Sequence, residues 1–412
     1  MKCKESKVID IIKAHGYDWS NLEFDAIFMD GNSNDLRNIK LPKDYNLLSK
    51  MYFSRFDYVY LPKINFDDYN FESVSLKNLI FTPDSVFSSD IKFFKKTHIT
   101  EFRNIILPSW DYSKYDFDGV QLKNITFTDD SKIPDDEDLF LKIKDSSLLG
   151  TKMPIMNYSK YNFTNVTVED AIFPEGSVLP KDFFRKIRNN FPSGTYIPSG
   201  DYREYDIPKL FLYKTRFSPK AIINIDVFNT VRQNSLRGVE LPDGDYSNLD
   251  LADKSCILLK FTRNSIIPYG KEFFQKIKNK NAIGINMPYG DYRDFNFDGA
   301  NLFCAKFTED SLLPEKYDFL QKIFDVMGKA QGDELPYLGI DFEFTNNMIE
   351  NIHNYDLSNI IIDLRPYNSL LKEQQKSLIR IRYKNLIGDR IFISDENINN
   401  KTIKENYNEL TI

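Results

Sequence analysis

Histidine, cysteine and tryptophan are scarce in this chain of 412 residues, which contains three His, three Cys and two Trp. No two of the histidines His15, His98 and His353 lie at a spacing that would suit a metal site or a catalytic dyad. The nucleotide and metalloprotease motifs GxxxxGK[ST], GxGxxG and HExxH are absent from the sequence. We therefore predict that the protein is not an enzyme and that it holds no metal and no cofactor.

The cysteines Cys3, Cys256 and Cys304 are odd in number and far apart, which excludes a disulfide framework and a zinc-binding spacing. This usage is typical of a reducing compartment. The N-terminal segment has no apolar run of signal-peptide length, and no stretch approaches the apolar length of a membrane span. We expect a cytoplasmic protein without a membrane span, and export by a route that needs no classical signal peptide stays open.

The chain also lacks a strong charge of either sign, because 54 basic and 60 acidic residues leave a net charge of -6. A general nucleic-acid binder would be basic, so we expect no direct nucleic-acid binding. Disorder is excluded by a hydrophobic content of 42% and an aromatic content of 15%. The aromatic residues are mainly Phe and Tyr, and they recur in a regular pattern.

A unit of about 46 residues repeats along the chain, and each copy is marked by a proline that follows an apolar residue. The second copy reads LPSWDYSKYDFDGVQLKNITFTDDSKIP and the sixth reads MPYGDYRDFNFDGANLFCAKFTEDSLLP. The spacings between the prolines are 46, 46, 44, 44 and 46 residues. The prolines are Pro62, Pro108, Pro154, Pro198, Pro242 and Pro288, with Pro336 opening a degenerate seventh copy.

Within each copy the apolar residues advance in steps of five. In the second copy one series is Leu107, Tyr112, Phe117, Leu122 and Phe127, and another lies two residues before it. A period of five fits neither an α-helix nor an alternating strand. It fits a chain that turns a corner every five residues and points two of the five inward. We expect the last phenylalanine of each run to be buried and stacked, namely Phe81, Phe127, Phe173, Phe217, Phe261 and Phe307.

The segment Ala300-Asn301-Leu302-Phe303-Cys304-Ala305-Lys306-Phe307 resembles the pentapeptide-repeat family. The resemblance implies a β-solenoid, a right-handed quadrilateral β-helix with about 20 residues per coil. Two departures are large residues at the first inward position and an interruption in every copy. The interruptions predict a short α-helix inserted in each repeat, at residues 135–145, 181–190, 271–280 and 315–327.

Helix packing constrains how many coils one repeat can make. Coils rise about 4.8 Å each, whereas packed helices need roughly 8–10 Å. Two coils per repeat would rise roughly 9.6 Å and satisfy the helices. The alternative is a curved α/β solenoid resembling leucine-rich repeats, with one coil per repeat. We expect a helical cap at 1–15, the solenoid at 16–364, and a C-terminal helical cap or tail at 365–412.

Asn and Asp recur at two places in each repeat, where we expect them to stack at two corners and bind backbone N–H groups of tight turns. An acidic stripe that imitates DNA is the alternative. One row is Asn65, Asp111, Asn157, Asp201, Asp245 and Asp291, and the other is Asn70, Asp116, Asn162, Asp206, Asp250 and Asn296.

The binding face is expected at the outward positions that vary between repeats. Lys123 in the second copy and Phe303 and Lys306 in the sixth hold such positions. Lys254 falls where an inward apolar residue is required, so either a bulge turns it outward or its charge is paired at a recognition site. The sequence predicts a protein-binding scaffold or host-interaction protein of bacterial or phage origin. The alternative is a DNA-mimic regulator of a topoisomerase or nuclease.

Overall fold

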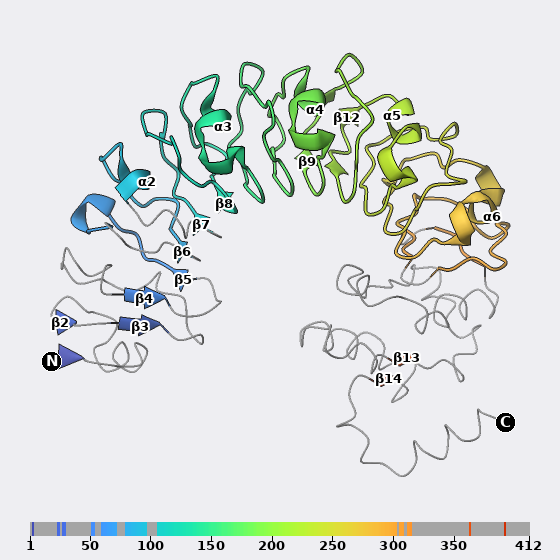
Figure 1. The fold of residues 1–412 in the computed structure, drawn as a ribbon. Helices are drawn as coiled ribbons and strands as arrows, with labels where there is room; N and C mark the ends of the chain where they lie inside the picture. The colour runs from blue at the N-terminus through green and yellow to red at the C-terminus, as the bar shows by residue number, and fades with distance from the viewer. Residues whose placement is uncertain are drawn as a thin grey trace, which may run out of the picture. The chain divides into compact units, whose positions relative to one another are not determined.

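The computed structural model describes residues 59–71, 79–96, 105–302, 305–308 and 311–314, together with short strands nearer the two ends (Figure 1). The chain divides into two compact units, Met1–Val227 and Phe228–Ile412, and each is described by itself. The predicted helix at 315–327 and the degenerate repeat after Pro336 lie outside the described residues, except for one short strand.

One long parallel ladder runs through the first unit (Figure 1). It starts as a four-stranded sheet and continues through single bridges from Thr126 to Lys152, Ile172 and Tyr196. Because its members are only two residues long, each marks one passage of the chain along this face. The strands are β5 (Val59–Tyr60), β6 (Leu79–Ile80), β7 (Ile105–Ile106), β8 (Ile125–Thr126), β9 (Tyr196–Ile197) and β11 (Arg216–Phe217).

The register of this ladder advances alternately by 20 and by 26 residues, as in the pairs Ile105–Ile125 and Thr126–Lys152. In the second unit the steps from Glu240 to Lys260 and from Lys260 to Asn286 are again 20 and 26 residues. The chain thus returns to the ladder twice in each repeat. This register agrees with two coils per repeat and does not agree with one.

Asn and Asp of the first row bridge to a residue 21 positions later, as in Asn157–Val178 and Asp245–Ile266. The strands β10 (Gly200–Asp201) and β12 (Ala221–Ile222) form the equivalent pair of the fourth repeat. A Val, Ile, Lys or Leu therefore lies between successive Asx residues. The expected direct stacking of the Asx row is wrong, because each repeat contributes two passages and only one of them carries the Asx.

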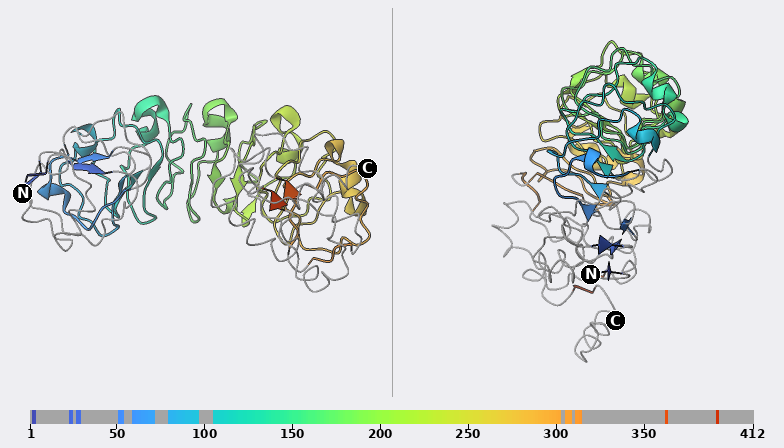
Figure 2. Two further views of the ribbon diagram at one scale, coloured as in Figure 1. Left: turned by 90° about the horizontal axis from the view of Figure 1, so that it is seen from below. Right: turned by 90° about the vertical axis from the view of Figure 1, so that its left-hand side faces the viewer.

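The inserted helices are single turns of four residues, much shorter than the segments that the sequence predicted. They end early because the next residue is extended, as at Ile187 with ψ 152°. In Figure 1 α2, α3 and α4 follow one another in a row, and Figure 2 shows α3 and α4 on the same side of the first unit. The helices are α2 (Phe93–Lys96), α3 (Leu139–Lys142), α4 (Phe183–Lys186), α5 (Asp226–Asn229) and α6 (Phe273–Lys276).

A 3-10 turn follows several of these helices and redirects the chain to its next passage. Its last two residues have positive φ, for example 58° at Asn189 and 54° at Asn190, where Asn is well tolerated. Helix-side residues Phe183, Phe184 and Ile187 are buried as predicted. The 3-10 turns are η2 (Phe66–Asp68), η4 (Lys144–Ser146), η5 (Arg188–Asn190), η6 (Arg232–Asn234), η7 (Gly270–Glu272) and η8 (Lys278–Lys280).

The core contains the predicted phenylalanine row, and all six members are at most 6% exposed. The rings of the row do not stack on one another among the recorded contacts. Phe173 instead meets Tyr158 and Phe163 of its own repeat, at centroid distances of 5.5 Å and 6.0 Å. Two passages per repeat separate successive members by roughly 9.6 Å, which is too far for ring contact.

Two side-chain hydrogen bonds explain much of the repeated text. The buried tyrosine four residues after the proline donates to the proline carbonyl, as in Tyr112 to Pro108 at 2.8 Å and Tyr158 to Pro154 at 2.6 Å. The hydroxyls of the FTxxS motif pair with each other, as in Thr128 and Ser131 at 2.7 Å. The motif therefore encodes a turn, and its serine is buried.

Short parallel strand pairs lie nearer the ends of the chain. Lys2 and Cys3 are extended in β1, which corrects the prediction of a helix at 1–15 for these two residues. The rest of 1–15 lies outside the described residues, as does 365–412 apart from one strand. The pairs are β1 (Lys2–Cys3) with β2 (Glu23–Phe24), β3 (Ile27–Met29) with β4 (Met51–Phe53), and β13 (Ile362–Asp363) with β14 (Ile391–Phe392).

Candidate functional site

The four predicted interface residues do not form one site. Lys123 belongs to the first unit, whereas Lys254 and Lys306 belong to the second. Phe303 lies outside the described residues. Lys123 and Lys306 are half-buried, and Lys306 lies on the long ladder opposite Asn286.

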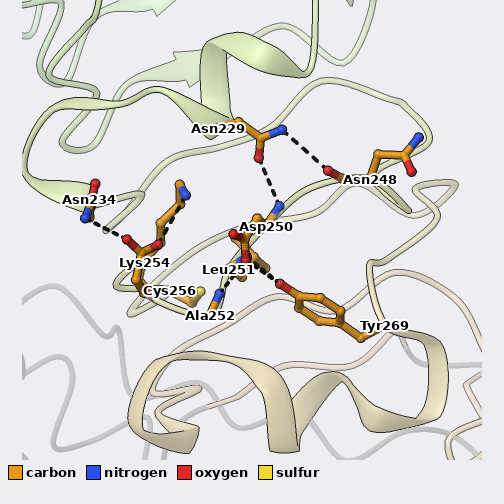
Figure 3. Close-up of polar contacts among 10 residues, drawn as sticks. Asn229, Asn234, Asn248, Asp250, Leu251, Ala252, Lys254, Cys256 and Tyr269 are labelled. Atoms are coloured by element: carbon orange, nitrogen blue, oxygen red, sulfur yellow. Dashed lines mark hydrogen bonds and ion pairs between the residues drawn. The ribbon is translucent and has the colours of Figure 1, made fainter.

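Lys254 is 4% exposed and points into the core (Figure 3). The expected outward bulge is wrong. The backbone N–H of Lys254 donates to the Leu251 carbonyl at 3.2 Å, as the N–H of Val120 does to the Phe117 carbonyl at 3.0 Å. The turn is therefore the ordinary one of the repeat, and it directs this side chain inward whatever its chemistry. Val120, Val166, Leu210 and Ala300 hold the same position in other repeats and are all buried.

The ammonium of Lys254 has one recorded partner, the Asp253 carboxylate, with 3.4 Å between Nζ and Oδ1. Asp253 has a side chain that is 59% exposed, and its other oxygen accepts from the Asn234 amide at 2.7 Å. The charge pair thus lies at the margin of the core. Burying an ammonium with one long ion pair is costly, since desolvation outweighs a weak attraction.

Cys256 lies two residues further on, where Leu122, Leu212 and Leu302 stand in other repeats. It is 2% exposed, and its smaller side chain compensates for the longer Lys254. Burial raises the pKa of the Cys256 thiol to about 12, against the opposing effect of the Lys254 charge. The thiol is protonated at neutral pH and is therefore a poor nucleophile.

The remaining polar groups of Figure 3 hold the adjacent turn in place. Asp250 Oδ1 accepts from the Ala252 N–H at 3.1 Å and from the Tyr269 hydroxyl at 2.9 Å. These two bonds lower the pKa of Asp250. The Tyr269 oxygen in turn accepts the Leu251 N–H at 2.7 Å, and Asn229 Oδ1 accepts the Asp250 N–H at 2.9 Å. The cluster is a backbone-fixing network, and its acceptors are occupied.

The Asx rows also serve the backbone. In all six residues of the first row the side-chain oxygen accepts the N–H two residues later, as in Asp111 to Ser113 at 3.0 Å. Asp206 of the second row differs because the residue two places on is Pro208, which has no N–H. Arg185 of α4 instead forms a bidentate pair with Asp206, which lowers the pKa of this carboxyl.

Exposed aliphatic residues recur in the first unit at one position of the repeat. Val86, Val178 and Ile222 are 42%, 47% and 50% exposed. Lys132 holds the equivalent position in the second repeat and interrupts the series. These residues are scattered singly, which is usual for a protein surface.

A cluster of half-exposed aromatic rings in the fourth repeat was missed by the sequence prediction. We define the aromatic patch as Phe191, Phe211 and Tyr213, all in the first unit. The ring centroids are 4.9 Å apart for Phe191–Phe211 and 6.4 Å apart for Phe211–Tyr213. Other repeats have polar residues in place of the two phenylalanines: Ser147, Ser235 and Asn281 for Phe191, and Gln121, Thr167, Ser255 and Asn301 for Phe211.

A signal for the patch was present in the sequence. Tyr213 is equivalent to the predicted interface residues Lys123 and Phe303, and Arg216 is equivalent to Lys306. The outward positions were compared only between the second and sixth copies, and the fourth copy carries the aromatic residues. The same rule applied to every copy would have found Phe211 and Tyr213.

Comparison with protein-family models, with curated proteins and with solved structures gave no match. Among the described residues no helix has the length and apolar character needed to cross a membrane. The same part of the chain contains no group of three or more His, Cys, Asp or Glu side chains placed to hold a metal ion.

Proposed function

We propose that this protein is a non-enzymatic protein-binding scaffold built as a β-solenoid. The proposed fold is a right-handed quadrilateral β-helix of the pentapeptide type, in which one of the two coils of each repeat carries a helical turn. The alternating register of 20 and 26 residues supports this proposal. So do the buried inward positions that recur every five residues, such as Tyr112, Phe117 and Leu122.

One observation carries the functional proposal. The side chains that build each repeat are constant, whereas the outward row at Lys123, Glu169, Tyr213 and Ile257 changes in charge and polarity from copy to copy. Constant residues are accounted for by turns and core, so this row is free to serve recognition. Solenoid proteins generally bind through such extended faces.

The alternative function, a DNA mimic, needs a continuous row of unpaired carboxylates. The Asx side chains are instead bonded to turn N–H groups, and several are paired with cations. Asp116 pairs with Lys95 at 2.6 Å and Asp206 pairs with Arg185. Asn162 and Asn296 of the second row are neutral. These features disfavour a phosphate-like stripe.

Site-specific photo-crosslinking tests the proposal. A photoreactive amino acid replaces Lys123 or Ile257 on the outward row, and Lys114 or Glu204 near the Asx corner as matched controls. After illumination in a lysate of the native cells, we expect protein adducts from the outward row and few from the controls. Adducts that are absent at every position, or that contain nucleic acid, would contradict a protein-binding scaffold. Adducts confined to the corner positions would assign binding to another face.

A further inference from the structure

The aromatic patch is unusual because its rings touch one another on neighbouring passages of the chain. Phe191 and Phe211 meet at 4.9 Å with an interplanar angle of 44°. Single exposed aromatic residues are ordinary, but contiguous ones mark interaction surfaces. The equivalent positions in other repeats are Ser, Thr, Asn or Gln, so the repeat does not need aromatic rings here to fold.

The backbone beneath the patch is firmly held. The Phe211 N–H donates to the Asn190 carbonyl at 3.3 Å, and Ser193 Oγ donates to the Tyr213 carbonyl at 2.8 Å. Thr215 Oγ1 donates to the Pro192 carbonyl at 2.8 Å. A surface that is already ordered loses little conformational entropy when a partner binds.

Two cations border the rings. Lys214 Nζ lies 5.1 Å from the centre of the Tyr213 ring, and the Arg216 guanidinium lies 5.7 Å from the centre of the Tyr196 ring. Arg185, Arg203 and Arg293 each pair with a carboxylate. Arg216 forms no ion pair with any described residue. Arg216 is therefore available to a carboxylate supplied by a partner.

We propose that the aromatic patch, with Lys214 and Arg216, binds an acidic peptide segment of a partner protein. An apolar side chain of the segment covers Phe191 and Phe211, and a neighbouring Asp or Glu pairs with Arg216. Aromatic residues and arginine are the side chains that most often dominate binding energy at interfaces. This inference rests on the proposed scaffold function and names the class of its partner.

The charges around the patch favour a peptide over single-stranded nucleic acid, which also stacks on aromatic rings. Glu169 and Asp170 lie on a preceding passage, joined to it by the Asp170 N–H and the Ser193 carbonyl at 2.8 Å. Hydrogen bonds from Tyr196, Ser218 and Ser199 outweigh the effect of burial and lower the pKa of Glu175 to about 2. A phosphate chain would cross these carboxylates, whereas a peptide can place its acidic residues at Arg216 alone.

Selection from a phage-displayed library of random peptides against the full-length protein tests the proposal. We expect enrichment of peptides that combine Asp or Glu with an aromatic or aliphatic residue. The affinity of a labelled, enriched peptide is then measured by fluorescence anisotropy. The double variant F191S/F211T carries residues that other repeats have at these positions, and it should weaken binding about tenfold or more.

The cation variants separate charge from packing. Asn124 has φ 55° at the position equivalent to Lys214, so K214N suits the backbone, and R216T copies Thr126 of the second repeat. Both should weaken the peptide and reduce the salt dependence of its binding, with unchanged thermal unfolding. The control S147A lies on the same face of the preceding repeat and should have no effect. If F191S/F211T does not fold, K214N and R216T alone still decide the question.

Each other outcome overturns the proposal. Peptides without acidic residues, or binding that is insensitive to both sets of variants, would place recognition elsewhere and leave a scaffold function intact. Tighter binding of an oligothymidylate than of any peptide, lost in F191S/F211T, would assign the patch to single-stranded nucleic acid. Failure to select any peptide overturns the patch proposal, and only the crosslinking experiment decides the fate of the scaffold function.

Discussion

The hydroxyl of Tyr158 donates a hydrogen bond to the carbonyl oxygen of Pro154, four residues earlier in the chain, at 2.6 Å. Tyr112, Tyr202, Tyr246 and Tyr292 form the same bond with the prolines of their repeats. Phe66 holds this position in the first repeat, which shows that the ring alone is compatible with the turn. The hydroxyl therefore adds a buried polar bond to a turn that is otherwise complete.

Replacement of Tyr158 by Phe should destabilise the protein by about 1–2 kcal/mol, because the Pro154 carbonyl loses its partner in the core. Equilibrium unfolding in urea measures the change. Tyr289 is 56% exposed, so Tyr289→Phe is a matched control that should change stability by less than about 0.5 kcal/mol. Equal effects of the two variants would contradict this account of the repeated tyrosine.

Serines of the FTxxS motif should respond differently to removal of their hydroxyl. Ser131 shares a hydrogen bond with Thr128, and Ser131→Ala should cost about 1 kcal/mol. Ser177 is buried without a hydrogen-bond partner for its hydroxyl, because Pro174 replaces the threonine. Ser177→Ala should therefore be neutral or stabilising. Denaturant unfolding of the pair checks this, and a larger loss in Ser177→Ala than in Ser131→Ala would refute it.

Truncation of Phe173, which is fully buried, should cost about 3–5 kcal/mol through lost burial and a residual cavity. The same experiment on Ile222, which is 50% exposed, should cost little. Thermal and denaturant unfolding give both values. A loss below about 1 kcal/mol for Phe173→Ala would be inconsistent with the packing described for the core.

Much of the core could be predicted from the sequence because burial follows the five-residue period. The phenylalanine row and the inward Phe183 and Phe184 are examples. Lys254 could not, because the period and the desolvation cost point in opposite directions for an ammonium. The turn at Leu251–Lys254 settles the direction through its backbone bond. The helix lengths were overestimated because acidic and basic residues extend beyond the four-residue turns and serve as ion-pair partners instead. Lys142, for example, pairs with Asp136.

The double variant K254V/C256L copies Val120 and Leu122 of the second repeat and should unfold at a higher denaturant concentration than the natural chain. The expected gain is about 1–3 kcal/mol, because a poorly paired buried charge is removed and the volume is refilled. Lys254→Val alone leaves space beside Cys256 and should gain less. A double variant less stable than the natural protein would mean that the Lys254–Asp253 pair stabilises this repeat.

Acid should weaken the contribution of Glu175, whose pKa falls from an ordinary 4.5 to about 2 in the folded chain. A lowered folded pKa stabilises the protein above the unfolded pKa, and this stabilisation is lost as pH falls toward the folded value. The difference in unfolding free energy between the natural protein and Glu175→Gln should thus be full above pH 4.5 and shrink toward pH 2. A difference that does not depend on pH in this window would contradict the role assigned to the carboxylate.

The alternation of 20-residue and 26-residue passages restricts how such a gene can lengthen or shorten. Deletion of a single 20-residue passage would bring two helical turns onto adjacent passages about 4.8 Å apart, and helices cannot pack that closely. Loss of a single 26-residue passage would leave two helix-free passages in succession and strip the core of its helix-borne phenylalanines. Duplication or loss of both passages together preserves every neighbour relationship. Natural variants of this chain should therefore differ in length by whole repeats of 44 to 46 residues.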